Sequence, residues 1–301
     1  MINILFLGGG RRVELAQRFI KRGYSIFSYE SSFDVPIIEV ATVLIGSNWK
    51  SSFIEIENII REYNIDLVIP LQDEAVIIAA CLRTDIPILV SDLKTAVTCF
   101  DKYSFGEFIL NNFPEHYPIP KESQEVLFKP RFGYGSRDIF YKESYEWNNI
   151  PDGYIAQRKI KGIEYSVDSY FNKYGEWVDS VVRTRDRISG GEVFSSCIIN
   201  NDRLRFLTKE INKRLGIKGP SNTQWIVDKD REWLLEINAR FGGGYTFSME
   251  AGLDAISLIE HDYFEGPAPI INIQYDLKLE RSYRDHYFGT KNNGYLGLSY
   301  R

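Results

Sequence analysis

Cysteine is scarce in this chain, which has three in 301 residues: Cys81, Cys99 and Cys197. They are far apart and show no metal-ligand spacing, so a sparse, odd set favours a reducing compartment over a disulfide framework. Long apolar runs are also missing, because no stretch approaches the ~20 apolar residues that a membrane helix needs. The apolar run at residues 2–7 is too short to be a signal core. We therefore expect a cytoplasmic protein with no membrane partner.

A strong charge bias is absent too. The chain has 36 Lys and Arg against 41 Asp and Glu, for a formal net charge of -5. Nucleic-acid binding usually needs a basic face, so we expect no nucleic-acid partner. The three histidines, His116, His261 and His286, fall outside every chemical motif and are interpreted as surface or structural residues.

The first 92 residues alternate between strand-like and helix-like segments, which predicts parallel β-α-β units. Buried strands are expected at 2–7, 24–29, 66–70 and 86–90, and helices at 13–22, 53–63 and 73–83. This pattern is typical of a Rossmann-like α/β domain over residues 1–92.

The texture changes in the rest of the chain. One long helix is expected over residues 93–111, followed by a linker at 112–120 that carries three prolines. After residue 126, short strands alternate with turns, which indicates a more antiparallel sheet. A helix at 203–215 and two strands at 223–227 and 233–237 follow, and no period is evident after about residue 266.

Three glycines, Gly8, Gly9 and Gly10, separate the first strand from the first helix, as in a nucleotide-binding turn. A dinucleotide fingerprint would need Gly or Ala at position 13, where Val13 stands, so close helix–strand packing is not encoded. Amides at a helix N-terminus favour an anion, and Arg11 and Arg12 add positive charge. Two interpretations stay open: the turn holds an acidic co-substrate, or it is a tight connection inherited from the fold.

The strongest chemical signal is the stretch WLLEINARFGGG at 233–244. Alternation along a strand puts Glu236, Asn238 and Arg240 on one face. Carboxylate and carbonyl oxygens suit Mg²⁺, the planar guanidinium suits phosphate, and Gln224 on the neighbouring strand adds a carbonyl oxygen. The alternative is a solvated polar face. The opposite, apolar face is expected to hold Leu235, Ile237 and Ala239.

A second stretch, FKPRFGYGS, begins at Phe128. Lys129 ends a strand, and a loop with two glycines and a serine follows. Successive backbone amides in such a loop make a phosphate cradle, although the spacing of a P-loop is missing. A plain β-turn fits the stretch equally.

A third stretch, QRKIKGIEYSVD at 157–168, has a strand, a glycine turn and an acid that enters the next strand. Its backbone suits an adenine edge, and Glu164 suits ribose hydroxyls. A hairpin with an exposed glutamate is the alternative.

Arginines recur at alternate positions, Arg183, Arg185 and Arg187, and on one strand they would share a face. They suit a phosphate or carboxylate, with Arg185 the favoured residue, and a charged solvent face is the alternative. Asp73 and Glu74 follow a predicted strand end, where they suit an amino group, and the favoured interpretation of Asp73 is a helix cap.

Taken in order, Lys102, FKPRFGYGS, QRKIKGIEYSVD, SNTQW and LLEINARFGGG resemble the ATP-grasp enzymes, and the carbamoyl-phosphate-synthase-like branch in particular. The resemblance covers roughly residues 1–265. It implies a Rossmann-like pre-ATP-grasp domain at 1–92 and an ATP-grasp fold of two α+β subdomains at 93–265, with a lid at about 115–157. Residues 266–301 would be a C-terminal extension that packs against the lid or a second copy of the chain in a homodimer. One grasp unit in 301 residues excludes a full carbamoyl phosphate synthase.

Site residues carry over by position. The resemblance implies that ATP contacts Lys102, Lys129, Gly133, Gly135, Ser136, Arg158, Lys159, Ile160, Glu164 and Gln224. The implied ligands of Mg²⁺, or of Mn²⁺ in its place, are Gln224, Glu236 and Asn238. Arg240 and Arg185 are the implied catalytic residues. Many members have Asp where Gln224 stands, and the lid departs from the usual pattern after Ser136.

The implied function is a Mg²⁺-dependent ligase that activates a small-molecule carboxylate as an acyl phosphate and joins it to an amine. An ATP-grasp carboxylase or phosphotransferase uses the same ATP site and is the alternative. A more remote alternative is a non-enzymatic dinucleotide sensor, in which the first glycine turn binds the cofactor and Glu30 its ribose.

Overall fold

The computed structural model describes residues 1–46, 53–121, 124–133, 138–143, 150–190, 192–229, 231–282, 285–286, 290–291 and 294–295. Gly135 and Ser136, two of the predicted ATP-binding residues, lie outside these ranges. The three cysteines are not paired with one another. Among the described residues, no helix is long and apolar enough to cross a bilayer.

The N-terminal part is a parallel sheet with the strand order β3-β2-β1-β4. Its strands are β1 (Asn3–Leu7), β2 (Ser25–Glu30), β3 (Thr42–Ile45) and β4 (Leu67–Pro70). Its helices are α1 (Val13–Ile20), the 3₁₀ turn η1 (Pro36–Glu39), α2 (Phe53–Glu62) and α3 (Asp73–Cys81). The expected strand at 86–90 forms only an isolated bridge between Ile88 and Val68, and β3 had not been predicted.

Strand β1 is buried on both faces because helices cover both sides of a parallel sheet. Ile4 and Phe6 pack in the same core cluster as Phe19 of α1. Leu5 and Leu7 point to the other face, into a cluster with residues of α2 and α3. The α/β character expected for this part of the chain is thus confirmed.

The single helix expected over residues 93–111 is wrong, because the chain breaks at Asp101. Helices α4 (Leu93–Phe100) and α5 (Lys102–Asn112) flank this residue, whose backbone is extended. The Asp101 carboxylate accepts from the Tyr103 amide at 3.1 Å and from both Arg131 Nε and Nη2 at 2.7 Å. Capping and ion pairing at Asp101 therefore start a new helix, with Lys102 as its first residue.

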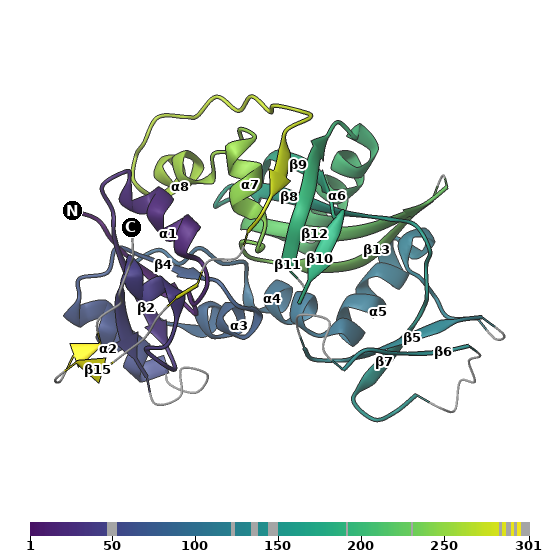
Figure 1. Ribbon diagram of the computed structural model, residues 1–301, viewed down its shortest axis with the longest axis horizontal. Helices are drawn as coiled ribbons and strands as arrows, with labels where there is room; N and C mark the ends of the chain where they lie inside the picture. Colours follow the sequence, from purple (N-terminus) through teal and green to yellow (C-terminus); the bar gives the residue numbers. More distant parts are fainter. Residues whose placement is uncertain are drawn as a thin grey trace.

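The largest sheet is antiparallel, as expected, and follows the path β10-β11-β9-β8-β12-β13, with β14 paired to β11. Its strands are β8 (Ile163–Phe171), β9 (Trp177–Thr184), β10 (Arg187–Ser189), β11 (Glu192–Ile199), β12 (Gly219–Asp228), β13 (Arg231–Asn238) and β14 (Lys278–Glu280). Helix α6 (Asp202–Leu215) lies against this sheet (Figure 1) and shares a core cluster with it.

A small antiparallel sheet with the order β6-β5-β7 lies apart from the large one, below β13 and α5 in Figure 1. It consists of β5 (Val126–Pro130), β6 (Phe140–Lys142) and β7 (Tyr154–Arg158), and the 3₁₀ turn η2 (Pro114–His116) precedes it. The predicted fold class, a Rossmann-like domain followed by α+β layers, is confirmed. The exact domain boundaries stay a prediction, although the expected lid range would hold almost all of this sheet.

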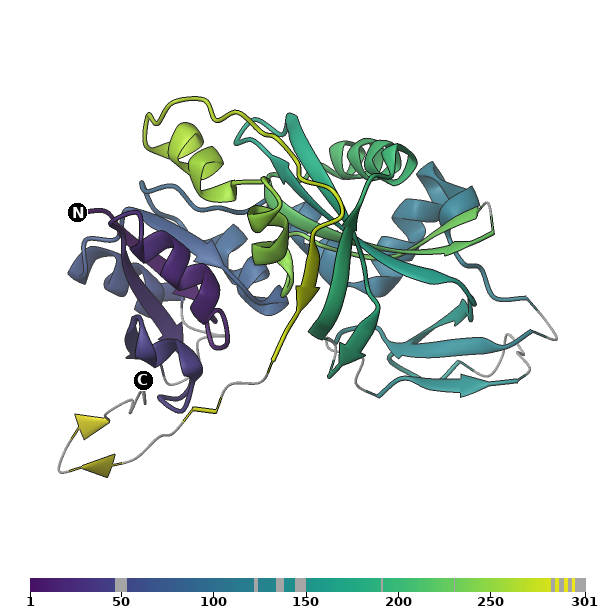
Figure 2. The ribbon, with the colours of Figure 1, turned by 45° about the horizontal axis from the view of Figure 1, so that its top comes forward.

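The last part of the chain links the two ends of the molecule. Helices α7 (Tyr245–Glu250) and α8 (Ala255–Tyr263) share a core cluster with β1 and α1. The chain then returns to the large sheet as β14 and continues toward the N-terminal part, where β15 (Thr290–Lys291) and β16 (Gly294–Tyr295) pair (Figure 2). A hydrogen bond of 2.8 Å between His286 and Glu39 lies on this return.

Candidate functional site

The hairpin of β12 and β13 carries a row of polar side chains on one half-buried face. Gln224 lies opposite Glu236 in the register. Asn238 donates from Nδ2 to Glu236 Oε1 at 3.2 Å, and Arg240 Nη2 donates to Asn238 Oδ1 at 3.2 Å. The expected common face therefore exists, with one carboxylate, two amides and one guanidinium in contact or in register.

The expected partition of the other face is wrong at Leu235. The register shifts between Gln224 and Trp225, so that Trp225 pairs with Leu234 and skips Leu235. Leu234 is fully buried, whereas Leu235 is only partly buried. This β-bulge re-aims the strand beside Glu236, and period-2 alternation along the sequence cannot reveal it.

Arg240 joins the large sheet to the N-terminal part. Its Nε and Nη2 donate to the two oxygens of Asp73 at 2.7 and 2.9 Å, and Nη1 donates to the Phe241 carbonyl at 3.1 Å. Burial opposes the charge of Arg240, yet the neighbouring Asp73 raises its pKa. The interpretation of Asp73 as a helix cap is wrong, because Gln72 occupies the N-cap of α3 and Asp73 instead pairs with Arg240.

Lys129 is a buried cation on β5, with 8% of its surface exposed. Burial lowers its pKa, the charges of Glu236 and Glu164 oppose this shift, and Lys102 adds to it. In the part of the chain that the structure describes, its ammonium group has no hydrogen bond or ion pair. Lys102 lies close by and donates from Nζ to the Gly133 carbonyl at 2.7 Å. Two lysines and two carboxylates thus gather between the small and large sheets.

The three alternating arginines do not share one strand face. Strand β9 ends at Thr184 and β10 begins at Arg187, so the strand is interrupted at Arg185. Arg183 is buried and pairs with Asp168 at 2.8 Å. Arg187 is largely exposed and forms a separate ion pair. The expectation of one arginine face is therefore wrong.

Arg185 contacts Glu164, the residue expected to bind ribose. Its Nε lies 3.1 Å from Glu164 Oε2, and its Nη1 donates to Ser166 Oγ at 3.3 Å. The Glu164 side chain keeps 29% of its surface exposed. Arg185 therefore holds Glu164 in place at the edge of the lysine–carboxylate group.

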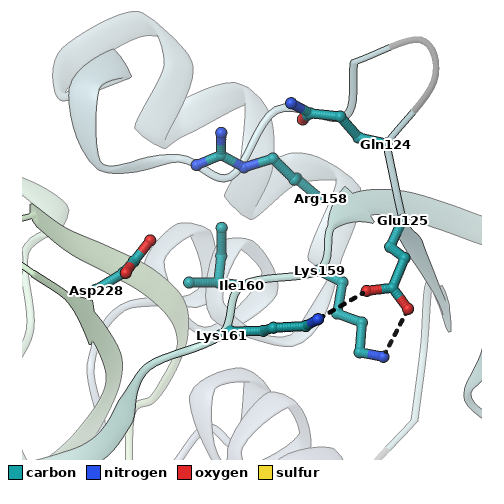
Figure 3. A pocket seen from close by; sticks show the side chains of 7 residues that line it. All are labelled: Gln124, Glu125, Arg158, Lys159, Ile160, Lys161 and Asp228. Carbon is teal, nitrogen blue, oxygen red and sulfur yellow. Dashed lines mark hydrogen bonds and ion pairs between the residues drawn. The ribbon is translucent and has the colours of Figure 1, made fainter.

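The segment expected to meet adenine borders an open pocket of about 330 Å³ (Figure 3). The side chains of Lys159 and Lys161 point to Glu125, at 3.0 and 3.7 Å. The amides of Arg158 and Lys159 donate to the carbonyls of Pro118 and Glu125. Among the described residues, no protein acceptor is recorded for the amide of Ile160. The pocket is lined by Gln124, Glu125, Arg158, Lys159, Ile160, Lys161 and Asp228.

Gln157, near the end of β7, was missed as a site residue. Only 2% of its surface is exposed, and its Oε1 has no hydrogen-bond partner among the described residues. Leaving a buried acceptor unpaired is unfavourable. A hydrogen-bond donor such as an amine would therefore stabilise this oxygen. No sequence pattern separates such a glutamine from a surface one.

A second charged group lies next to Arg240, and its members were also missed. Arg281, just after β14, donates from Nη1 to Glu192 Oε2 at 3.4 Å and from Nη2 to the Gly243 carbonyl at 3.2 Å. Burial and the neighbouring charge of Arg240 lower the pKa of Arg12 to about 10, against the opposing charge of Glu192. Arg12 had been noted only as charge beside the glycine turn, and Arg281 lies where no pattern was evident.

The first glycine turn closes onto an internal acid. The Gly10 amide donates to Glu30 Oε1 at 2.8 Å, and Ser28 Oγ donates to the same oxygen at 2.6 Å. Burial raises the pKa of Glu30. Because Glu30 is buried and already holds the turn, the interpretation of Glu30 as a ribose ligand is wrong, and so is the idea that the Gly10 amide is free for an anion.

Residues 152–280 match the family model described as ATP-grasp in the biosynthetic pathway with Ter operon. The match spans most of the large sheet, including Glu164, Gln224 and the stretch from Glu236 to Arg240. No curated protein sequence matched the chain.

Several solved structures are similar to this chain. N5-carboxyaminoimidazole synthetase from Staphylococcus aureus, complexed with ADP, has a TM-score of 0.69 and 14% identity over 90% of this chain and 80% of that one. The biotin carboxylase domain of 2-oxoglutarate carboxylase from Hydrogenobacter thermophilus was solved with MgADP and bicarbonate. It has a TM-score of 0.68 and 14% identity over 92% of this chain and 73% of that one. L-amino acid ligase from Bacillus licheniformis has a TM-score of 0.63 and 14% identity over 87% of this chain and 74% of that one. The resemblance to the ATP-grasp proteins is confirmed.

Proposed function

We propose that this chain, which has the ATP-grasp fold, is an ATP-dependent ligase that joins a small-molecule carboxylate to an amine. The observation that carries the proposal is Lys129, a buried cation with no partner in the described chain, beside Lys102 and two carboxylates. A buried charge needs a counter-ion, and the phosphates of ATP would supply it. An ATP-grasp enzyme is also the class that the family match and the structural neighbours support.

The residues present fit ATP at both of its ends. Among the described residues, Gln157 Oε1 is a buried acceptor without a donor, and the exocyclic amine of adenine would supply one. Glu164 is held by Arg185 and still half-exposed, so it can accept hydrogen bonds from ribose hydroxyls. Lys102 and Lys129 would meet the phosphates. The lid residues Gly133, Gly135 and Ser136 keep their predicted role as a cover.

The residues also fit one divalent ion. Glu236 is the carboxylate, and Gln224 and Asn238 are the amides beside it. Mg²⁺ in phosphate enzymes is usually held by one or two carboxylates and by the phosphates themselves, so one acid suffices here. Mn²⁺ accepts the same oxygen ligands. Within the described residues, no cluster of three His, Cys, Asp or Glu forms a separate metal cage.

The chemistry needs charge neutralisation more than covalent help. ATP supplies the phosphoryl group that converts the carboxylate into an acyl phosphate, and the amine then forms the amide bond as phosphate leaves. Carboxylate and γ-phosphate are both anionic, so the protein must position them and offset their charge. Lys102, Lys129 and Arg240 provide the positive charge. The two hydrogen bonds from Arg240 to the Asp73 carboxylate fix the plane of the Arg240 guanidinium group.

The test is the release of ADP and phosphate from ATP when carboxylates and amines are supplied in pairs. We expect release to require Mg²⁺ and to fall about 100-fold or more in Glu236→Gln, because a metal ligand supports several kcal/mol of transition-state stabilisation. Glu232→Gln, on the same strand but paired with Arg203, is the matched control and keeps its activity.

The alternatives give different products. A bicarbonate requirement would identify a carboxylase, and a phosphorylated product without amine incorporation would identify a phosphotransferase. Unchanged ATP turnover in Glu236→Gln would disprove the site itself.

A further inference from the structure

Three arginines from three separate parts of the chain meet beside the second glycine turn. Arg12 follows the first glycine turn, Arg240 lies two residues after β13, and Arg281 follows β14. A Cβ added to Gly243 would lie 3.0 Å from Arg12 Nη1 and would clash with the Glu192 carboxylate. The side chains of Arg12 and Glu192 therefore lie directly over Gly243, with Arg281 bonded to its carbonyl.

The group has one positive charge in excess. Three guanidinium groups face two carboxylates, those of Asp73 and Glu192. Asp73 occupies two nitrogens of Arg240, and Glu192 pairs with Arg281. The guanidinium group of Arg12 has no hydrogen bond and no ion pair in the described part of the chain, although the residue is partly buried. A desolvated charge without a partner is unfavourable, so the cluster lacks one anion.

The position of the cluster relative to the ATP residues sets what that anion can be. Arg240 feels the charges of both Glu236, one of the proposed ATP-site residues, and Glu192. The leading charges around Arg12 are those of Arg240, Glu192, Asp73 and Arg281, whereas those around Lys129 are Glu236, Lys102 and Glu164. Arg240 thus borders both groups, whereas the leading charges around Arg12 include none of those around Lys129.

We propose that Arg12 and Arg281 bind a second oxyanion of the carboxylate substrate, at the end opposite to the carboxylate that reacts beside Arg240. The substrate is then a dicarboxylate or a phosphorylated carboxylate rather than a simple monoacid. The inference rests on the proposed function and adds the substrate class. It also gives a role to the C-terminal extension, because Arg281 belongs to it.

Binding can be tested without turnover. Thermal unfolding of the wild-type chain, Arg12→Gln, Arg281→Gln and the control Arg11→Gln is followed with succinate, inorganic phosphate or acetate at matched ionic strength. Arg11 is exposed and adjacent to Arg12 in the sequence, and the Arg11→Gln substitution removes the same charge as Arg12→Gln. We expect succinate or phosphate to raise the Tm of the wild type and of Arg11→Gln, acetate to raise neither, and Arg12→Gln to lose the shift. The larger of the two shifts assigns the group as carboxylate or phosphate.

Stability without any anion separates binding from a structural role. Because Arg12 carries the excess charge, Arg12→Gln should keep or raise the Tm of the free protein. A substrate found by the ADP-release screen should then show a Michaelis constant raised about 10- to 100-fold in Arg12→Gln, as expected for one lost hydrogen bond to a charged group. The Michaelis constant for ATP should not change.

The outcomes are distinct. An absent anion shift in the wild type, an equal shift in Arg12→Gln, or a lower Tm of the free variant with an unchanged Michaelis constant would overturn the inference. Mg²⁺-dependent ADP release that Arg12→Gln leaves unaltered would overturn this inference alone. Anion binding at Arg12 in a protein that never releases ADP would instead overturn the proposed function.

Discussion

Two runs of three glycines occur in this chain, at 8–10 and at 242–244, and each follows a strand and precedes a helix. They have different physical origins. Gly8 and Gly10 have positive φ angles, +74° and +32°, which glycine adopts more easily than other residues. Gly244 has a φ of -100°, which any residue can adopt. The first run answers a backbone requirement at Gly8 and Gly10, and a packing one at Gly9, where a Cβ would clash with Ser28 Oγ. The second run has no positive φ and must be glycine for packing alone.

The second run is glycine because side chains pack on its backbone. A Cβ at Gly242 would lie 3.0 Å from Asn222 Cβ, and one at Gly244 would lie 2.7 Å from Arg183 Cζ. Gly243 lies under Arg12 and Glu192 in the same way. An identical three-letter sequence therefore makes a turn in one place and a platform for charged groups in the other.

Both runs nevertheless bring an arginine to the same place, Arg12 after the first and Arg240 before the second. Neither run needs its own amides for a phosphate, because the Gly10 amide is bonded to Glu30 and the glycines at 242–244 are covered by side chains. Glycine runs next to a strand thus point to the proposed site here through the charged residues that flank them.

The largest effect is expected for the support under the second run, the buried pair of Arg183 and Asp168. Arg183 is 2% exposed, and Asp168 also accepts from Asn222 at 2.5 Å and Ser248 at 2.7 Å. Arg183→Met would leave a buried carboxylate uncompensated and should lower the free energy of unfolding by about 3–5 kcal/mol. Urea unfolding measures this.

The exposed pair of Arg187 and Glu280 provides the control. Arg187→Met should cost less than about 1 kcal/mol. Similar losses in the two variants would mean that the platform under Gly244 is not held by a buried ion pair.

Alternation of strands and helices predicted β1, β2 and β4 of the parallel sheet, because the burial of each of these strands is evident from its own residues. It missed β3, and the strand expected at 86–90 forms only an isolated bridge. Local sequence patterns also fail where a distant partner decides. Asp101 breaks a continuous helix pattern because Arg131, 30 residues later, pairs with it. Leu235 leaves the apolar face because the register to β12 shifts there.

The site divides along the same line. Glu236, Asn238 and Arg240 share a face that period-2 spacing already encodes. Glu192 and Arg281 meet only because β14 returns to pair with β11, and no spacing in the sequence records that return. Gln157 differs from a surface glutamine only by what covers it.

An intermediate effect is expected for Gly244→Ala, which would sharpen the packing half of the comparison. The new methyl group would meet the guanidinium of Arg183, which its ion pair keeps from moving, so the loss should be about 2–3 kcal/mol. Gly10→Ala meets no atom within 4 Å and pays only for its positive φ, about 1–2 kcal/mol. Unfolding of both variants is compared in urea.

A double variant makes the cause specific. If Arg183 is the obstacle, Gly244→Ala should cost clearly less in the Arg183→Met background, since contacting residues are coupled. An additive loss would place the cause in the backbone and remove the distinction between the two runs.

The smallest effect is expected for Glu30→Gln, which tests the conformational half of the comparison. Glutamine can accept from the Gly10 amide and from Ser28 as glutamate does, but it carries no charge. Burial raises the pKa of Glu30 in the folded protein. Its contribution to stability is therefore full below the pKa of the unfolded chain and is lost as pH rises through the higher folded value.

Tm is measured from pH 4 to pH 8 for the wild type, Glu30→Gln and the control Glu62→Gln, an exposed residue at the end of α2. We expect Glu30→Gln to match the wild type at the acid end and to gain on it as pH rises, by less than the losses above. A variant that loses stability at neutral pH would instead mean that the turn needs the negative charge of Glu30, and the first run would then be an anion site whose anion is built into the chain.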